Sequence, residues 1–248
     1  MSHMFILKEM MSESNRVIII GGTSGIGLVT AQYLKNKGYV PIVAGRRSVD
    51  LEGIETCKVD VCSEESVAEL FNVSLKQYDD INALVYAVGI ASPRKSIEGF
   101  DKDSWDNIIT TNVTGVLLTL KYSFAVLKRN RGRVVIVNSL ASRRYSELSG
   151  MEYTASKAAL GGLVRQLSIE WASDNVLINS VYPGMTMTPM LTENVSKSKL
   201  KEIEEKIPLG RIARPEEVAR AIEFLINPEN TYITGTGVDV CGGQYLNG

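Results

Sequence analysis

Histidine is nearly absent from this chain of 248 residues, and the only one, His3, lies close to the first residue. That scarcity argues against a Ser-His-Asp hydrolase and against metal centres built on imidazole. Any acid–base chemistry must then depend on Tyr, Lys, Asp, Glu or Cys side chains.

Cysteine is also scarce, with only Cys57, Cys62 and Cys241. An odd number without Cys-x-x-Cys spacing argues against a disulfide framework and against a zinc site. Residues 1–15 contain no apolar stretch long enough for a signal peptide. We therefore expect a reduced, cytoplasmic protein.

The chain has no excess of charge of one sign and no long apolar run. It has 27 basic and 28 acidic residues, a net charge of −1. Such a balance gives no general surface for nucleic acid or membrane. No apolar run approaches the roughly 20 residues that span a bilayer. We expect a small-molecule partner.

Short apolar runs typical of strands alternate with helical patterns along the whole chain. The alternation predicts βαβ units, and hence an α/β fold with a parallel sheet flanked by helices. The expected strands cover residues 17–20, 40–44, 56–59, 83–86, 134–138, 176–181 and 237–240, and the expected helices cover residues 26–37, 64–76, 105–129, 154–172 and 215–226. No linker interrupts the pattern, so we predict an N-terminal tail (1–15) and one domain (16–248).

A glycine-rich turn follows the first predicted strand, with Gly21, Gly25 and Gly27 ahead of a helical pattern. Glycines let the backbone approach a pyrophosphate, and a helix N-terminus supplies free N–H groups and a positive dipole end. Strand, glycine turn and helix in this order indicate a dinucleotide site. The alternative is an ordinary βα turn.

A phenol and an ammonium stand four residues apart at Tyr153 and Lys157. Positions i and i+4 share one face of a helix. A lysine beside a tyrosine lowers the pKa of the phenol from about 10, which suits proton transfer near neutral pH. By itself the pair is also typical of a solvated helix face.

Together these motifs resemble the short-chain dehydrogenase/reductase family, in its single-domain branch, from about Arg16 to the last residue. Further matching segments are Thr111-Asn112, Asn138-Ser139, Pro183-Gly184 with Thr188, Pro208-Leu209-Gly210-Arg211, Pro215-Glu216-Glu217-Val218 and Gly242-Gly243. The resemblance implies a Rossmann-type doubly wound sheet of about seven strands in the order 3-2-1-4-5-6, with residues 237–240 as the seventh.

The resemblance also implies the catalytic roles. Tyr153 would be the general acid or base, and Lys157 would lower its pKa and bind the nicotinamide ribose. Ser139 would donate to the substrate oxygen, with Ser142 as its competitor. Asn112 would hold a water that links Lys157 to solvent; otherwise it merely kinks a long helix.

The cofactor is expected to be NADP(H), with NAD(H) as the alternative. Gly45 stands where NAD-dependent enzymes carry an acid, and Arg46 and Arg47 follow, suited to a 2′-phosphate. Both arginines could instead be solvated. Asp60 would accept from the adenine amino group or cap the following helix. The resemblance adds these cofactor contacts: Gly21, Ser24, Gly25, Ile26, Gly27, Val61, Ala87, Gly89, Tyr153, Lys157, Pro183, Gly184, Thr186 and Thr188.

Residues 185–209 are predicted to form a substrate lid that contains a helix over 199–206; alternatively they form a surface excursion in which methionines fill gaps. We also expect a homotetramer, or at least a dimer, that buries the helices over 105–129 and 154–172. Its apolar contact residues would be Leu117, Leu163, Leu167 and Trp171.

The expected function is NADPH-dependent reduction of a ketone. One candidate substrate is a 3-oxoacyl thioester on an acyl carrier protein docked at the basic run 128–131, as in 3-oxoacyl-carrier-protein reductases. Alternatively, this run only complements the dipole at the C-terminus of a helix. The second reading is oxidation of a cyclic alcohol or dihydrodiol, as in dihydrodihydroxybenzoate dehydrogenases, with Arg143 and Arg144 available for a substrate carboxylate. A nucleotide-binding scaffold without chemistry is the third, although a scaffold has no need of Asn112, Ser139, Tyr153 and Lys157 together.

Overall fold

The computed structural model describes residues 15–47 and 49–246, so most of the predicted tail lies outside the described residues. Its centre is a seven-stranded sheet in the order β3-β2-β1-β4-β5-β6-β7. The strands are β1 (Arg16–Ile20), β2 (Val40–Gly45), β3 (Glu55–Lys58), β4 (Ile81–Tyr86), β5 (Arg133–Val137), β6 (Leu177–Pro183) and β7 (Gly237–Val240). All neighbouring strands are parallel. The predicted fold class and strand order are confirmed.

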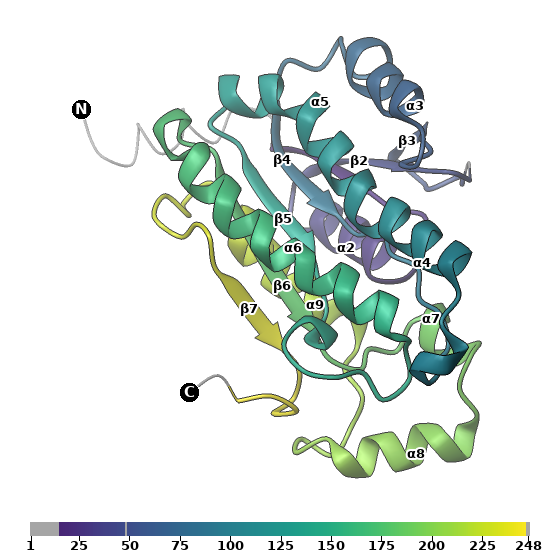
Figure 1. Cartoon of the computed structure of the whole chain (residues 1–248). Helices are drawn as coiled ribbons and strands as arrows, with labels where there is room; N and C mark the ends of the chain where they lie inside the picture. Colours follow the sequence, from purple (N-terminus) through teal and green to yellow (C-terminus); the bar gives the residue numbers. More distant parts are fainter. Residues whose placement is uncertain (1–14, 48, 247–248) are drawn as a thin grey trace.

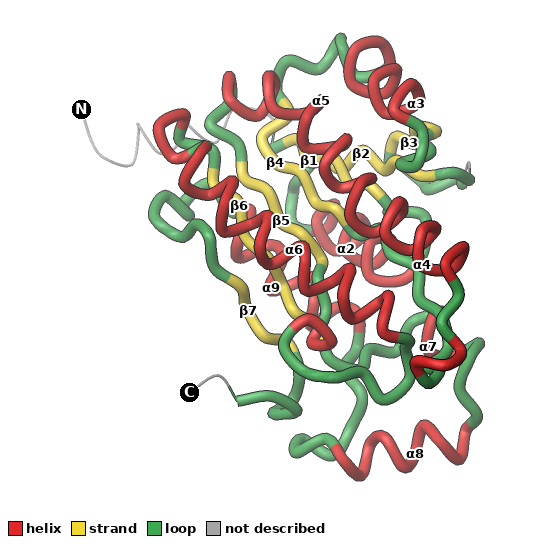
Figure 2. The backbone as a smooth tube through the Cα atoms, in the orientation of Figure 1, coloured by secondary structure: helices red, strands yellow, loops and turns green. Residues whose placement is uncertain are grey.

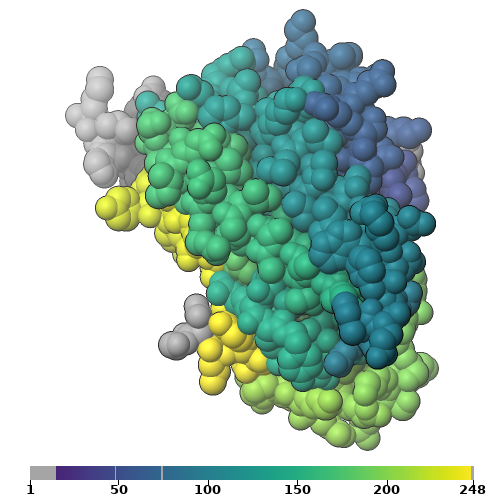
Figure 3. All heavy atoms as spheres, viewed as in Figure 1, coloured from purple at the N-terminus to yellow at the C-terminus, as the bar shows by residue number. Residues whose placement is uncertain are grey.

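Helices cover both faces of the sheet (Figures 1 and 2). One face packs against α2 (Gly25–Asn36) and α9 (Pro215–Ile226). The other packs against α5 (Gly115–Arg129) and α6 (Met151–Glu170), with α3 (Glu64–Glu69) and α4 (Lys102–Ile109) beside them. The space-filling view shows the segments of α4, α5 and α6 as one continuous surface (Figure 3).

The sheet is buried on both sides, and its central strands consist mostly of apolar residues. In β1, Ile18 and Ile20 lie in the core beneath α5 and α6, whereas Val17 and Ile19 lie in the core beneath α2 and α9. Successive strand residues point to opposite faces, so a continuous apolar run is what a doubly covered strand requires. Each fully buried Val or Ile side chain contributes about 1.5–3 kcal/mol.

Two of the expected helices are interrupted by π-helical turns. The helix expected over 105–129 consists of α4, a π-helical segment at Thr110–Thr114 and α5. It begins earlier than predicted because the Asp101 carboxylate accepts from the backbone N–H of Asp103. The helix expected over 64–76 ends as an α-helix at Glu69, and a π-helical segment (Leu70–Ser74) follows.

Trp171, at the end of α6, belongs to the core and not to an exposed face. It is only 5% exposed and stacks on Phe124 of α5, with ring centroids 4.9 Å apart. The prediction that Trp171 supplies interface area is therefore wrong, because the side chain stacks on Phe124 within its own subunit. Leu117 on α5 and Ile169 on α6 are large apolar side chains that are exposed.

The segment between β6 and α9 forms a separate small layer beside the carboxyl ends of the strands (Figure 1). It contains α7 (Pro189–Thr192) and α8 (Lys197–Lys206), which share an apolar cluster of their own. The cluster consists of Leu191, Ile203, Ile207 and Ile212. Met187 N–H donates to the Ala213 carbonyl at 2.9 Å, which joins the two ends of the segment. Among the described residues no helix is long and apolar enough to cross a membrane.

Candidate active site

The predicted site residues come together at one edge of the sheet. Parallel strands end at the same edge, so the residues that follow each strand become neighbours. The turns that follow β1, β2, β3, β4, β5 and β6 begin at Gly21, Arg46, Val59, Ala87, Asn138 and Gly184. The fold therefore brings segments that are far apart in the sequence together at the carboxyl edge of the sheet.

The glycine turn after β1 fits a pyrophosphate. Gly21 has φ +84°, which favours glycine, and a Cβ on Gly27 would lie 2.3 Å from the Gly21 carbonyl oxygen. Ser24 is the N-cap of α2, yet its side chain makes no capping bond, and the first turn holds no acidic residue. The first N–H groups of α2, at Gly25, Ile26 and Gly27, are thus left for an anion.

The end of β2 has no room for the carboxylate that would select NAD. A Cβ at Gly45 would lie 2.8 Å from Cγ2 of Thr23, so the Thr23 side chain occupies that space. Arg46 and Arg47 are exposed, and neither guanidinium has a hydrogen bond or ion pair with the described residues. Both are available to a phosphate.

The turn after β3 corrects one interpretation of Asp60. Ser63 is the N-cap of α3, and its hydroxyl accepts from Ser66 N–H at 3.2 Å. Asp60 does not cap that helix. Its carboxylate accepts from Cys62 N–H at 3.0 Å and remains exposed at the edge of the sheet, while Val61 is buried.

Tyr153 and Lys157 lie one turn apart in the first half of α6. The Lys157 Nζ donates to the Val137 carbonyl at 3.0 Å and lies 5.8 Å from the centre of the Tyr153 ring. Lys157 is only 3% exposed. A Cβ on Gly89 would lie 3.3 Å from that Nζ, so the turn after β4 runs directly past the ammonium group.

Asn112 does more than kink a helix. It lies in the π-helical turn and is fully buried. Its Oδ1 accepts from Ile90 N–H at 2.9 Å, and its Nδ2 donates to the Ile90 carbonyl at 2.9 Å and to the Ser156 hydroxyl at 3.0 Å. Asn112 thereby connects the turn after β4 to α6. Such π-helical turns are frequent at functional sites.

Ser139, and not Ser142, is the serine beside Tyr153. The Ser139 hydroxyl is hydrogen-bonded to the Tyr153 side chain and accepts from Ala141 N–H at 3.1 Å. The Ser142 hydroxyl donates to the Ser139 carbonyl at 2.8 Å and is committed to the backbone. Ser139 directly follows β5, where the backbone is rigid.

Burial sets the protonation of both groups on α6. It raises the pKa of the Tyr153 phenol, and the hydrogen bond from Ser139 opposes this only in part. Burial also lowers the pKa of the Lys157 ammonium to about 8. The expectation that the Tyr153 pKa is lowered is wrong for the protein itself, because desolvation outweighs the hydrogen bond.

A cavity of about 330 Å³ opens beside these groups. Ser139 and Tyr153 line it, together with the loop over 144–149 and the first part of the segment after β6. Pro183, the last residue of β6, lines it as well, as do Gly184, Thr186 and Thr188 in the segment that follows. A Cβ on Gly25 would lie 3.8 Å from Thr188, so the cavity adjoins the glycine turn. A substrate in the cavity could thus meet a dinucleotide held by α2.

Comparison with known proteins agrees with this geometry. The sequence profile described as enoyl-(acyl carrier protein) reductase matches residues 21–244. The chain belongs to the short-chain dehydrogenase/reductase family.

Relatives in the family align over almost the whole chain. The 3-oxoacyl-[acyl-carrier-protein] reductase FabG of Aquifex aeolicus is 31% identical over 244 residues, covering 92% of this chain and 96% of the relative. The cis-4-hydroxycyclohexanecarboxylate dehydrogenase of Sinomonas cyclohexanicum is 28% identical over 243 residues, covering 91% and 94%.

Solved structures agree as closely in fold. The aldohexose dehydrogenase of Thermoplasma acidophilum superposes with a TM-score of 0.87 at 27% identity, covering 94% of both chains. ElxO with NADP bound superposes with a TM-score of 0.86 at 26% identity, covering 93% of this chain and 98% of ElxO. The protein is thus an NAD(P)-dependent oxidoreductase acting on CH–OH or C=O groups.

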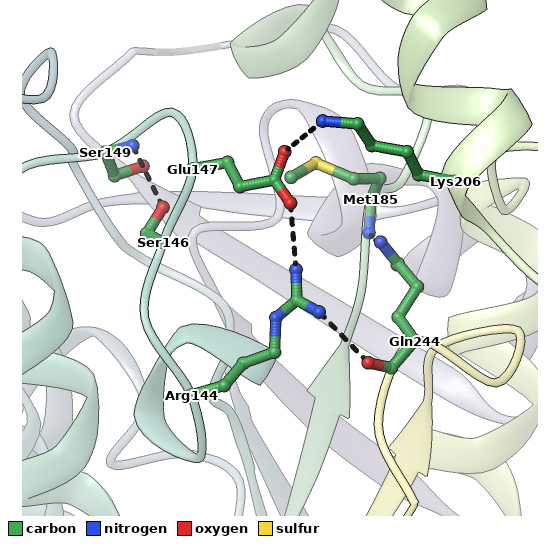
Figure 4. Close-up of polar contacts among 7 residues, drawn as sticks. All are labelled: Arg144, Ser146, Glu147, Ser149, Met185, Lys206 and Gln244. Atoms are coloured by element: carbon green, nitrogen blue, oxygen red, sulfur yellow. Dashed lines mark hydrogen bonds and ion pairs between the residues drawn. The ribbon is translucent and has the colours of Figure 1, made fainter.

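In this short-chain dehydrogenase/reductase the cavity also contains Glu147 and Gln244, which the sequence alone did not indicate, beside Arg144, which it did. Figure 4 shows Arg144 between the Glu147 carboxylate and Gln244, with Lys206 of α8 on the other side of Glu147. Gln244 and Glu147 both line the cavity, yet Gln244 is 100 residues from Arg144 in the sequence. No local sequence pattern could predict the contact between Arg144 and Gln244.

Ser92 and Glu152 were likewise not indicated, and they position the start of α6. The buried Glu152 carboxylate accepts from the hydroxyls of Ser92 at 2.7 Å and Ser104 at 3.3 Å. Gly150 N–H, at the N-cap of α6, donates to the Ser92 carbonyl at 2.9 Å. These bonds fix the turn that carries Tyr153. Among the described residues no cluster of three His, Cys, Asp or Glu side chains could hold a metal.

The depressed pKa of Lys157 leads to a stability prediction for the protein without cofactor. A pKa lowered from 10.5 to about 8 corresponds to about 3 kcal/mol between the two protonation states. Between those values the unfolded chain still holds the proton that the folded chain has released, so stability rises with pH. We expect wild type to gain up to about 3 kcal/mol over Lys157→Met between pH 7 and 10.

Urea unfolding of both proteins at the two pH values measures this gain. Other titrating groups are common to both proteins and cancel in the comparison. Lys201→Met, at an exposed position of α8, is the control: it keeps Lys157, so its stability should differ from that of wild type by the same amount at both pH values. A stability difference between wild type and Lys157→Met that stays flat with pH would contradict the burial argument.

Proposed function

We propose that the protein reduces a ketone to a secondary alcohol with NADPH. The observation that carries the proposal is the juxtaposition of Tyr153, Ser139 and the cavity beside an uncapped, glycine-rich helix N-terminus. A nicotinamide cofactor held there supplies the hydride.

Tyr153 and Ser139 act on the substrate oxygen. Charge develops on a carbonyl oxygen as its carbon is reduced, and hydroxyl donors stabilise it. Ser139 donates to that oxygen and Tyr153 gives it a proton. The raised pKa of Tyr153 keeps the phenol protonated at neutral pH, which suits the reductive direction.

Lys157 and Asn112 assist Tyr153 without contacting the substrate oxygen themselves. Lys157, with its pKa near 8, can donate or accept a proton within the physiological range. Asn112 holds the turn after β4 against α6, which keeps Gly89 next to the Lys157 ammonium. We assign Lys157 to proton supply and ribose binding, and Asn112 to a water that links Lys157 to solvent.

NADPH is the proposed cofactor because Arg46 and Arg47 follow β2 without a hydrogen bond or ion pair to the described residues, and because Gly45 stands where a carboxylate would select NAD. The related ElxO was solved with NADP bound, which supports the same choice here. The proposed contacts are the glycine turn and α2 N-terminus for the pyrophosphate, Arg46 and Arg47 for the 2′-phosphate, and Asp60 for the adenine. Residues 183–188 would contact the nicotinamide, and residues 185–209 would close over it as a lid.

An acyl carrier protein is the weaker candidate partner. In the basic run 128–131, Lys128 pairs with Asp174 at 2.8 Å and Arg129 pairs with Asp79. Asn130 donates to three backbone carbonyls. These residues complete the end of α5, so a free small-molecule ketone is the better substrate class.

The second candidate function is oxidation of a cyclic alcohol. The relative that acts on cis-4-hydroxycyclohexanecarboxylate favours it, as does the short connection between β2 and β3. A scaffold without chemistry is disfavoured, because Ser139 and Tyr153 are hydrogen-bonded to one another and line an open cavity.

A substrate panel tests the proposal. Ketones and cyclic alcohols are offered with NADPH, NADH, NADP⁺ and NAD⁺, and turnover is followed by nicotinamide absorbance. Reduction of at least one ketone with NADPH, faster than any alcohol is oxidised at pH 7, is expected. Faster alcohol oxidation would favour the second function, and no turnover of any compound would favour the scaffold.

We further propose a homotetramer in the cytoplasm. Leu117 on α5 is 42% exposed and Ile169 on α6 is 80% exposed, whereas Leu163 and Leu167 are only partly buried. Apolar side chains on adjoining helices suit a shared interface. Light scattering at micromolar concentration should give a mass above that of the monomer, and Ile169→Asp should lower it. A wild-type monomer would refute this.

A further inference from the structure

Arg144 is the only basic side chain that lines the substrate cavity, as far as the described residues go. Among the described residues that line it, Glu147 supplies the one carboxylate. The Arg144 side chain is 27% exposed, so its guanidinium can be reached from the cavity that holds Ser139 and Tyr153. A charge in this position must affect which substrates bind.

The guanidinium of Arg144 is only partly used within the protein. Its Nη1 donates to the Gln244 carbonyl at 3.1 Å, and its Nη2 lies 3.5 Å from Oε1 of Glu147. Charge-assisted bonds between Arg and carboxylate are normally about 2.7–2.9 Å. Of five N–H donors, therefore, one makes a good bond and one a long one.

Glu147 does not neutralise Arg144 fully, because it is shared. Its Oε2 lies 3.2 Å from the Nζ of Lys206 on α8 (Figure 4). One carboxylate between two cations leaves the cluster with an excess positive charge at the cavity. An anionic group is attracted to such a cluster, and a cationic group is repelled.

Arg143, the neighbour in the sequence, has no comparable freedom. Its guanidinium lies 3.9 Å from the centre of the Tyr182 ring, and its Nε lies 3.0 Å from Oδ1 of Asp239. It does not line the cavity. Of the two consecutive arginines, only Arg144 is placed to meet a substrate.

We propose that the substrate carries a carboxylate remote from its reacting carbon, and that Arg144 binds this carboxylate while Ser139 and Tyr153 hold the carbonyl or alcohol oxygen. Only the placement of the carbonyl or alcohol oxygen at Ser139 and Tyr153 rests on the proposed function; the carboxylate site at Arg144 does not. In this arrangement the substrate carboxylate competes with Glu147 for Arg144, and Glu147 keeps its contact with Lys206.

Binding of unreactive probes tests the carboxylate site without depending on catalysis. Cyclohexanecarboxylate and cyclohexanecarboxamide are titrated calorimetrically into the full chain with NADP⁺ present. Wild type is expected to bind the carboxylate about 10- to 100-fold more tightly than the amide, the usual effect of one good charge-assisted contact. Arg144→Gln should remove this preference and leave amide binding unchanged.

Two further variants sharpen the test. Glu147→Gln should strengthen carboxylate binding, because it removes the competing anion. Arg94→Gln is the matched control: Arg94 is an exposed arginine whose guanidinium also lies near the Tyr145 ring, at 6.0 Å, but it does not line the cavity. The Arg94→Gln variant should prefer the carboxylate probe to the amide probe by the same factor as wild type.

Several outcomes would overturn the inference: equal affinity of wild type for both probes, no binding of either probe, or equal weakening of both by Arg144→Gln. Equal weakening of both probes would mean that Arg144 acts only by holding Gln244 in place through their hydrogen bond. The proposed function is tested separately, by turnover of 4-oxocyclohexanecarboxylate and its carboxamide. Arg144-dependent binding without turnover of any ketone or alcohol would refute the proposed function but leave the carboxylate site standing.

Discussion

Tyr153→Phe is expected to lower kcat by about 10²- to 10⁴-fold, the usual contribution of a general acid or base. The phenyl ring keeps the shape of the side chain and removes only its hydroxyl. That hydroxyl is hydrogen-bonded to Ser139 and reaches the cavity where a carbonyl would lie. Without the hydroxyl, the substrate oxygen that becomes an alkoxide still accepts a hydrogen bond from Ser139, but no general acid transfers a proton to it.

Cofactor binding should survive this change, because the glycine turn and the first turn of α2 are untouched. Steady-state kinetics at saturating NADPH and ketone give kcat, and fluorescence titration gives the dissociation constant of NADPH. Tyr122→Phe is a control for removal of a hydroxyl: it loses a bond to Glu64 at 3.0 Å on the exposed side of α5. A Tyr153→Phe enzyme with kcat close to that of wild type would refute the assignment.

Changing Arg46 and Arg47 together to Ala should weaken NADPH by about 10- to 100-fold and leave NADH nearly unchanged. A guanidinium binds a phosphate through charge-assisted, often bidentate hydrogen bonds. Losing such a contact at a partly exposed site costs about 1.5–3 kcal/mol, which corresponds to that range. Because neither guanidinium is bonded to the described residues, the change breaks no hydrogen bond or ion pair that the structure records among them.

Dissociation constants of both cofactors, measured for wild type and for the double variant, test the prediction. Arg220→Ala, at an exposed position of α9, removes a positive charge that is not among the proposed cofactor contacts and should alter neither constant. Tighter binding of NADH by wild type would exclude the proposed preference. Equal weakening of both cofactors would mean that the arginines only support the turn after β2.

The fold could be predicted because its signals are local and repeated. A strand covered on both faces needs an uninterrupted apolar run, and a helix between two such strands forces a parallel sheet. The glycine turn and the pair Tyr153 and Lys157 are equally local. Four residues along a helix return to the same face, so their spacing alone brings them together.

Interruptions within helices were less visible. The π-helical turn that holds Asn112 is stabilised by bonds from its side chain to Ile90, which is 22 residues away in the sequence. Helical periodicity shows where a helix exists but not where one extra residue is accommodated. Trp171 was misplaced for a related reason: its position on α6 was expected, but its stacking on Phe124 depends on how α5 and α6 pack.

The sequence by itself determined the architecture, the family and the set of reactive side chains, because each of these follows from residue types at short spacings. Tertiary structure alone decided which serine meets Tyr153, which of two adjacent arginines faces the substrate, and in which direction the pKa of Tyr153 moves. Those outcomes depend on burial and on contacts between distant segments, such as Arg144 with Gln244. Desolvation acts on a group only once the rest of the chain has closed around it.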